Sequence, residues 1–140
     1  MFVMATGLVI SYLVYFLLNE GSDACIAVQG DLGNEETEDV KIRWRFLFIY
    51  GMAVWFLMAV IALISICSGL HERLSLTNNL LVNLVANVPV TVHTVYLGFY
   101  SFIWWGRQCR DKEEFQHIGN FIFRVFITQI VAQITFYFCT

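Results

Sequence analysis

Long runs of apolar residues, separated by short polar segments, dominate the sequence. Four runs reach the roughly 17 to 25 predominantly apolar residues that a transmembrane helix needs. They cover residues 2–18, 46–70, 80–105 and 115–138. The pattern predicts an all-α membrane protein, a bundle of four transmembrane helices with short loops, in which residues 1–140 form a single transmembrane domain.

The first and the fourth run carry additional signals near their ends. Ser22-Asp23-Ala24 resembles the cleavage site of a secretory signal, but no basic segment precedes the first run, so we expect a retained helix. Before the fourth run, Asp111-Lys-Glu-Glu114 has the spacing of a capping box. This spacing predicts that the last helix begins at Asp111, where the carboxylates suit the helix dipole.

Composition agrees with a membrane protein and excludes several functions. Hydrophobic residues make up 59% of the chain and charged residues 14%, against about 45–50% and about 25% in soluble proteins. A net charge of −3 with eight basic residues argues against nucleic-acid binding. The sequence contains no nucleophile–base pair, metal-ligand cluster or glycine-rich phosphate loop, so we expect neither an enzyme nor a cofactor.

Residues 19–40 form the most polar connection, with seven acidic residues and no basic one. This composition is typical of a solvated loop, and docking onto a basic partner is the alternative. Basic residues cluster in or beside loops one and three, whereas loop two holds Arg73. The six on the first side are Lys41, Arg43, Arg45, Arg107, Arg110 and Lys112. Since Lys and Arg concentrate on the cytoplasmic side, loops one and three should face the cytoplasm or the mitochondrial matrix.

The four cysteines divide between the two faces of such a bundle. Cys25 and Cys109 lie on one face, and Cys67 and Cys139 lie near the other. If the outer face is oxidising, a disulfide between Cys67 and Cys139 is the candidate, and the other two cysteines remain thiols. Four unpaired cysteines are the alternative, because cysteine is often a small apolar packing residue.

The third run carries a stripe of polar and small residues within about 80° of arc on a helix. These residues are Asn83, Asn87, Thr91, Thr94, Gly98 and Ser101. We expect this stripe to be buried against another helix, with a polar conduit as the alternative. His93 lies about 80° from Asn83 and should form a hydrogen bond across the same seam. A haem would need a second axial ligand, for which only Met58 has a compatible depth, so we expect none.

The fourth run is polar on two sides. Arg124 is expected to reach toward the headgroups and to pair with a phosphate or a carboxylate. Gln129 and Gln133 lie one turn apart on nearly the opposite side. A lone bundle leaves one face of each helix to lipid, so two polar sides indicate neighbours beyond this chain.

These patterns predict a non-catalytic accessory or structural subunit of a larger multi-subunit membrane complex. Its partners would be other membrane-protein subunits and a phospholipid bound near Arg124. By analogy with assemblies rich in small subunits, a respiratory-chain complex of the mitochondrial inner membrane is the expected location. The alternative function is a small channel or transporter with a polar path along the third helix.

Overall fold

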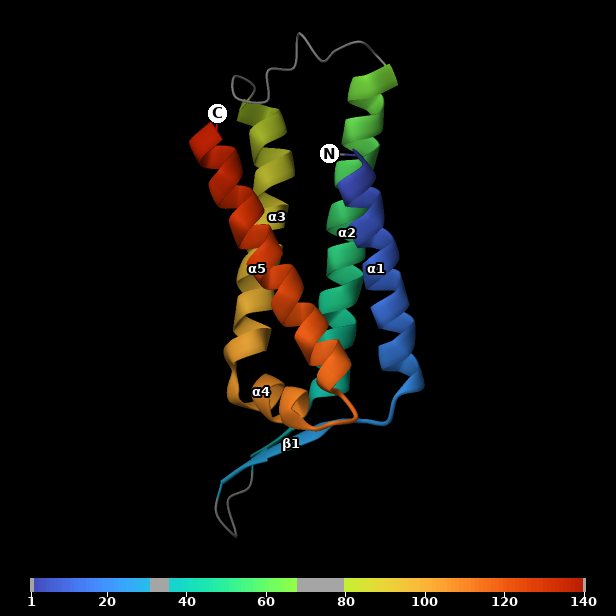
Figure 1. Ribbon diagram of the computed structural model, residues 1–140, viewed down its shortest axis with the longest axis vertical. Coiled ribbons are helices and arrows are strands. Elements are labelled where there is room, and N and C mark those ends of the chain that lie inside the picture. Colours follow the sequence, from blue (N-terminus) through green and yellow to red (C-terminus); the bar gives the residue numbers. More distant parts are fainter. Residues whose placement is uncertain (1, 31–35, 68–79, 140) are drawn as a thin grey trace.

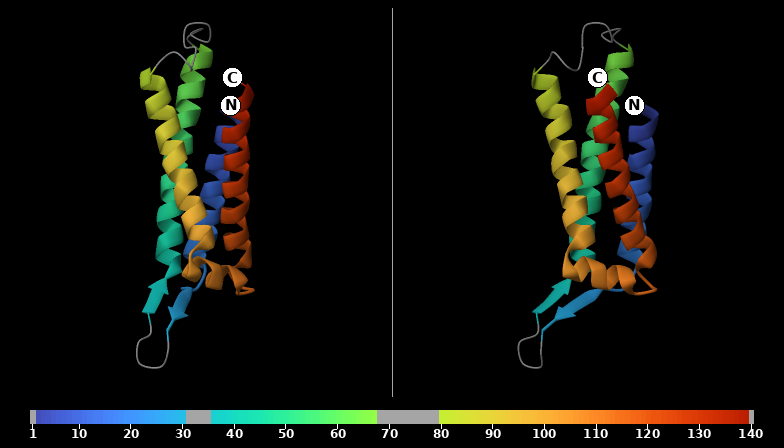
Figure 2. Two further views of the ribbon diagram at one scale, coloured as in Figure 1. Left: turned by 90° about the vertical axis from the view of Figure 1, so that its left-hand side faces the viewer. Right: turned by 60° about the vertical axis from the view of Figure 1, so that its left-hand side comes forward.

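The computed structural model describes the backbone of residues 2–30, 36–67 and 80–139, and the side chains of residues 2–30, 36–67 and 87–134. Its elements are, in order, α1 (Phe2–Gly21), β1 (Ile26–Gln29), β2 (Glu36–Asp39), α2 (Val40–Cys67), α3 (Leu80–Phe102), α4 (Trp104–Asp111) and α5 (Gln116–Cys139). The long helices α1, α2, α3 and α5 run side by side, with β1, β2 and α4 at one end (Figure 1). We call this the hairpin end, and both further views show the same arrangement (Figure 2).

Three helices in the part of the chain that the structure describes are long and apolar enough to cross a membrane. They are α1, α2 and Gln116–Ile134 of α5. The mostly helical fold and these helices support a membrane-embedded protein. The backbone of α3 extends over 23 residues, but side chains are described only from Asn87 onward. A bundle of four spans therefore stays a prediction.

The acidic connection after α1 contains a β-hairpin that the sequence did not predict. β1 and β2 pair antiparallel, with Ile26 opposite Asp39 and Gln29 opposite Glu36. The amide and the carbonyl of Val28 both bond to the side chain of Gln108 in α4, at 3.0 and 2.8 Å. Gln108 therefore satisfies backbone groups that an exposed strand edge would leave unpaired.

The last long helix does not begin at Asp111, so the predicted capping box is wrong. Asp111 is instead the final residue of α4, and α5 begins at Gln116. The cause is an extended backbone at two residues. Ile103 (φ −63°, ψ 149°) ends α3 and starts α4, and Lys112 (φ −77°, ψ 127°) ends α4 directly after Asp111. Gly106 permits the corner at Ile103, because a Cβ there would lie 2.1 Å from the carbonyl oxygen of Tyr100.

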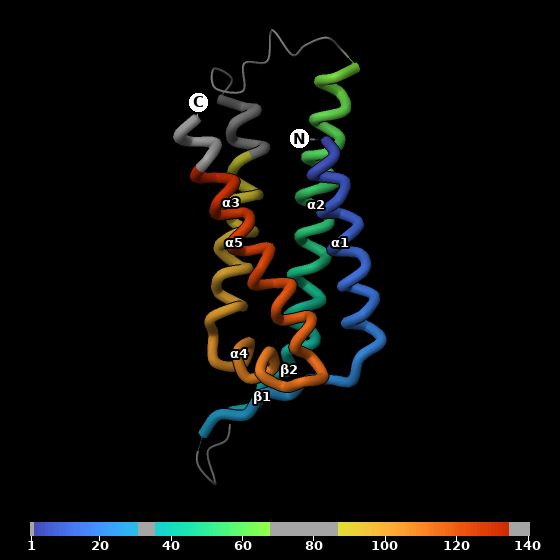
Figure 3. Tube along the Cα trace, viewed as in Figure 1, coloured from blue at the N-terminus to red at the C-terminus, as the bar shows by residue number. Residues whose placement is uncertain are grey.

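The interior is filled mainly by large side chains. α1 packs along α2, and α3 packs against α5 and α2. The largest fully buried hydrophobic side chains are Trp44, Tyr12, Phe48, Leu97, Ile118 and Ile122. The Cα trace shows α5 running obliquely, beside α3 in its later turns and toward α1 in its first turns (Figure 3). Large apolar side chains on the outside of these helices are exposed, as lipid-facing positions require.

Candidate functional site

A hydrogen-bonded polar cluster joins α3 to α5 inside the bundle. The hydroxyl of Thr94 lies 2.7 Å from Gln129 Oε1 and 2.9 Å from the carbonyl of Val90, two acceptors for its single proton. Gln133 Nε2 donates to the same hydroxyl at 3.1 Å. Thr94 and Gln129 are both buried. The amides thus find partners inside the chain, which removes the cost of exposing them to hydrocarbon.

His93 extends this cluster toward α1 and α2. Its Nδ1 lies 3.4 Å from Gln129 Nε2, and its ring meets that of Tyr12 edge-on with centroids 5.3 Å apart. Both rings are fully buried. Gly51 of α2 makes room for them, because a Cβ there would lie 2.9 Å from His93 Nε2 and from two ring carbons of Tyr12. His93 Nε2 and Tyr12 Oη have no hydrogen-bond partner among the described residues.

The rest of the predicted stripe on α3 is divided between inside and outside. Ser101 is buried and donates to the Leu97 carbonyl at 2.7 Å. Asn87 is half-buried, and Thr91 is exposed. The side chain of Asn83 lies outside the described residues. The structure therefore brings together His93 and Thr94, through Gln129, rather than the stripe as a whole.

Arg124 lies on a different face of α5 from the two glutamines. Its side chain is exposed, whereas Gln129 is 3% exposed. Thr128, one turn further on, is also exposed and donates its hydroxyl proton to the Arg124 carbonyl at 2.9 Å. The outward polar side of α5 thus contains one group, the guanidinium, whose charge is not compensated within its own helix.

Arg124 lines a pocket of about 390 Å³ between α1 and the beginning of α5. The residues around it are Tyr15, Glu113, Gln116, His117, Asn120, Phe121 and Arg124. Sequence reasoning identified Arg124 but missed the others. The spacing of His117, Asn120 and Arg124, at i, i+3 and i+7, places them on one helix face and could have indicated a shared site.

A second pocket of about 380 Å³ lies between α2 and α3, also near the hairpin end. It is lined by Arg43, Phe46, Leu47, Tyr50, Tyr96 and Tyr100. The guanidinium of Arg43 forms an ion pair with Glu38 of β2. Rings of Tyr96 and Tyr100 lie nearly parallel, with centroids 6.2 Å apart. This pocket is mostly aromatic, and its cation is already paired.

The hairpin end contains a disulfide between Cys25 and Cys109, whose Cα atoms are 6.1 Å apart. The expectation that these two residues remain thiols is wrong, because α4 packs on β1 and brings Cys109 next to the residue that precedes the hairpin. The predicted bridge from Cys67 to Cys139 is not formed either, since Cys67 is an exposed free thiol. The side chain of Cys139 lies outside the described residues.

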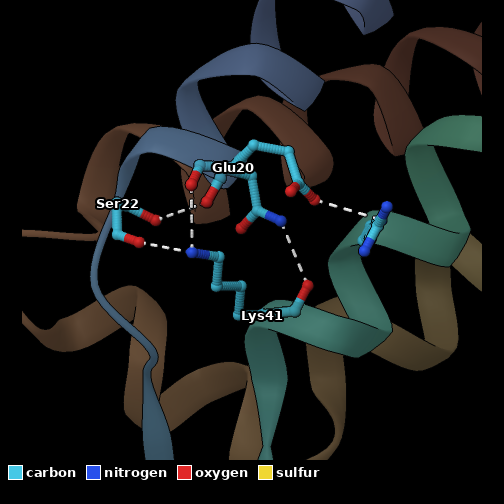
Figure 4. A network of polar contacts seen from close by, with 5 residues as sticks. Glu20, Ser22 and Lys41 are labelled. Atoms are coloured by element: carbon cyan, nitrogen blue, oxygen red, sulfur yellow. Dashed lines mark hydrogen bonds and ion pairs between the residues drawn. The ribbon is translucent and has the colours of Figure 1, made fainter.

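Basic side chains at the hairpin end have local partners. The ammonium of Lys41 donates to the carbonyls of Glu20 and Ser22, and so ties the end of α1 to the start of α2 (Figure 4). Arg45 forms an ion pair with Glu20 at 3.1 Å. Lys112 donates to the Ile26 carbonyl at 3.1 Å. These contacts, with the disulfide, fasten the hairpin to the bundle.

No group of three or more His, Cys, Asp or Glu side chains that could hold a metal ion occurs in residues 2–30, 36–67 and 87–134. Comparison of the chain with protein-family models, with curated proteins and with solved structures found no match.

Proposed function

We propose that this chain is a non-catalytic subunit of a larger membrane complex. The observation that carries the proposal is the arrangement of polar groups around α5. Gln129 and Gln133 bond to Thr94 within the chain, whereas Arg124 is exposed on the other side of the helix. A cation within a membrane span needs a partner, and Arg124 has no ion pair within the described residues, so the partner we propose is another chain or a tightly held lipid.

The depth of Arg124 supports this reasoning. It follows the first residue of α5 by eight positions, which places its Cα roughly 12 Å along the helix. A guanidinium can reach part of that distance toward the interface. We further propose that α3 is the fourth span, because its 23 residues contain no charged side chain.

Two observations disagree about which compartment the hairpin end faces. The six basic residues favour the cytoplasm or the matrix, whereas the disulfide between Cys25 and Cys109 favours an oxidising compartment. We propose the oxidising side. A reducing cytosol would open the bond, while five of the six basic side chains have acidic or carbonyl partners.

The respiratory-chain assembly and the mitochondrial inner membrane expected from the sequence stay a proposal. The alternative of a small channel or transporter draws support from the polar cluster of His93, Thr94, Gln129 and Gln133, because it lies at the interior junction of α3 and α5. These groups hydrogen-bond to each other, and the His93 ring packs against the rings of Tyr12 and Tyr50, which suits a helix seam better than a wetted path. A channel also leaves exposed Arg124 unexplained.

Copurification tests the subunit proposal. The tagged chain, extracted in a mild detergent, should retain a fixed set of other chains, and Arg124→Leu should release them. Arg107→Leu is the matched control, because Arg107 is an exposed arginine of α4 outside the spans. A wild-type chain that purifies alone and supports solute flux in liposomes would favour the channel instead. Partners retained equally by both variants would remove the role given to Arg124.

The compartment that the hairpin end faces can be tested independently with a single substitution. Glu36→Thr creates an Asn-Glu-Thr glycosylation acceptor at Asn34. Glu36 is exposed at the start of β2, so the change should leave the fold intact. Glycan addition in cells would place the hairpin end in the secretory lumen. An unglycosylated chain whose Cys25 and Cys109 react with an impermeant maleimide from the cytosolic side without reductant would contradict the oxidising placement.

A further inference from the structure

The pocket between α1 and α5 has opposite charges at its two ends. Arg124 lines it deep in the helix, and Glu113 lines it in the turn before α5, at the hairpin end. Both side chains are exposed. The amides of Gln116 and Asn120 and the imidazole of His117 lie between them along the chain. The order from membrane to water is therefore the guanidinium, then the two amides and the imidazole, then the carboxylate.

This order matches the headgroup of a zwitterionic phospholipid. The phosphate of such a lipid lies nearer to the acyl chains and its amine lies nearer to water. Arginine is the side chain best suited to a phosphate, because its planar guanidinium can donate two parallel hydrogen bonds. A carboxylate at the water end would repel a second anionic group and attract an ammonium. An acidic lipid without an amine would leave Glu113 unpaired.

The aromatic residues of the pocket distinguish between two kinds of amine. A quaternary ammonium is usually held by several aromatic faces arranged as a cage. Here Tyr15 and Phe121 stack on each other, with centroids 3.7 Å apart and planes inclined by 6°, so each covers one face of the other. A primary ammonium needs no cage, because it can donate hydrogen bonds directly to Glu113.

Phe121 is held in place from behind by buried rings. It meets Tyr12 edge-on at 5.6 Å between centroids and lies 6.1 Å from Phe48. Both of those side chains are fully buried. The apolar wall of the pocket therefore packs directly against the core, and it presents a fixed surface to a bound lipid.

We propose that the pocket between α1 and α5 binds a phospholipid with a primary amine, with its phosphate on Arg124 and its ammonium on Glu113. The acyl chains lie outside, along the apolar surfaces of α1 and α5. The inference rests on the proposed need of Arg124 for an outside partner and names that partner as a lipid. It holds whether or not further protein chains are attached.

Native mass spectrometry of the purified chain in detergent tests this inference. The probes are dioleoyl phosphatidylethanolamine, phosphatidylcholine and phosphatidylglycerol, each titrated separately, with inorganic phosphate as a competitor. The ethanolamine lipid should bind up to about fivefold more tightly than the choline lipid, the upper end of what an exposed ion pair contributes. Phosphate should not displace it, because a bare anion leaves Glu113 unpaired and lacks acyl chains.

Substitutions test which side chain binds the ammonium of the lipid headgroup and which binds its phosphate. Glu113→Gln should make the ethanolamine and choline lipids bind equally, and Arg124→Gln should weaken all three lipids. Glu114→Gln is the matched control, because Glu114 is an exposed neighbour that does not line the pocket. Equal binding of ethanolamine and choline lipids by the unaltered chain would overturn the proposal. So would preference for the glycerol lipid, displacement by phosphate, or equal effects of Glu113→Gln and Glu114→Gln.

Failure here can be told apart from failure of the subunit proposal. If Arg124→Leu releases copurifying chains while lipid selectivity is absent, the guanidinium has a protein partner and only the lipid inference fails. If Glu113→Gln abolishes lipid selectivity while copurification never occurs, the lipid inference stands and the subunit proposal fails.

Discussion

A single methyl group at Gly51 should disturb the packing of α1, α2 and α3. A Cβ at this residue would lie 2.9 Å from His93 Nε2 and from ring carbons Cε1 and Cζ of Tyr12. Ordinary contact begins at 3.4 Å, so the methyl group is 0.5 Å too close to both rings. Both rings are fully buried. Neither can move aside without shifting α1 or α3, and the expected result is overpacking.

The expected magnitude follows from comparison with Gly7→Ala. A Cβ at Gly7 meets nothing within 4 Å, so that variant reports only the gain of replacing glycine in a helix, about 0.5–1 kcal/mol. Gly51→Ala gains the same amount and loses about 1–3 kcal/mol to overpacking. The helix term cancels in the difference. Gly51→Ala should therefore be about 1–3 kcal/mol less stable than Gly7→Ala.

Unfolding of the purified chain by sodium dodecyl sulfate in mixed micelles measures this difference. Tryptophan fluorescence is a suitable signal, because Trp44 and Trp55 are buried. In a Tyr12→Ala background the cost of Gly51→Ala should fall, since one of the two clashing rings is gone and the effects of contacting residues are not additive. A Gly51→Ala variant as stable as Gly7→Ala would refute the close packing of α1, α2 and α3.

Two other predictions concern bonds within the chain. Replacing Cys25 or Cys109 by Ser should lower the free energy of unfolding by about 2–4 kcal/mol. The double variant should lower it no further, and Cys67→Ser should leave it unchanged. Different effects of the two single variants would contradict the disulfide. Gln129→Leu should cost about 0.6–2 kcal/mol, as interhelical hydrogen bonds in membranes do, whereas Thr128→Val on the exposed side should change stability by a few tenths. Equal effects of these two variants in the same unfolding assay would remove the energetic role of the polar cluster.

Three of the four predicted runs were confirmed as helices long and apolar enough to cross a membrane, because length and apolar composition decide which segments can do so. The predicted run at 46–70 became α2 at Val40–Cys67, which begins six residues earlier, directly after β2. Lys41 and Arg43, which the sequence pattern places just before the second apolar run, lie in the first turn of α2. Their charges are compatible with a helix because Lys41 donates hydrogen bonds to the carbonyls of Glu20 and Ser22, and Arg43 forms an ion pair with Glu38.

The hairpin end was not predictable from local pattern. The strands are four residues each, and β2 reads Glu-Thr-Glu-Asp, which favours a solvated loop. It forms a strand because distant residues complete it. Gln108 bonds the edge of β1, and Cys109 bonds Cys25, 84 positions away. The predicted topology places these two cysteines on one face of the bundle. The excess of Lys and Arg on that face indicated a reducing compartment, so a disulfide between them was not predicted.

The polar interior was predictable in part. Angular position on a helix separated Gln129 and Gln133 from Arg124, and in the structure the two glutamines bond inward while Arg124 is exposed. The same reasoning put Thr91 on the stripe with Thr94, yet Thr91 is exposed. The angular position of a residue around its own helix does not show along which turns a neighbouring helix stays in contact. That depends on how the two helices cross, and α5 runs obliquely past α3 (Figure 3).

Whether a neighbouring chain covers the outer side of α5 can be measured by photocrosslinking in the native membrane. A photoreactive residue at Ile127, exposed and near Arg124 on the helix surface, is compared with one at Ile10 on the outside of α1. A subunit predicts a crosslink from Ile127 to one protein of defined mass, lost in Arg124→Leu, and only lipid adducts from Ile10. Lipid adducts alone from both positions would contradict the proposal that this chain belongs to a larger complex through α5.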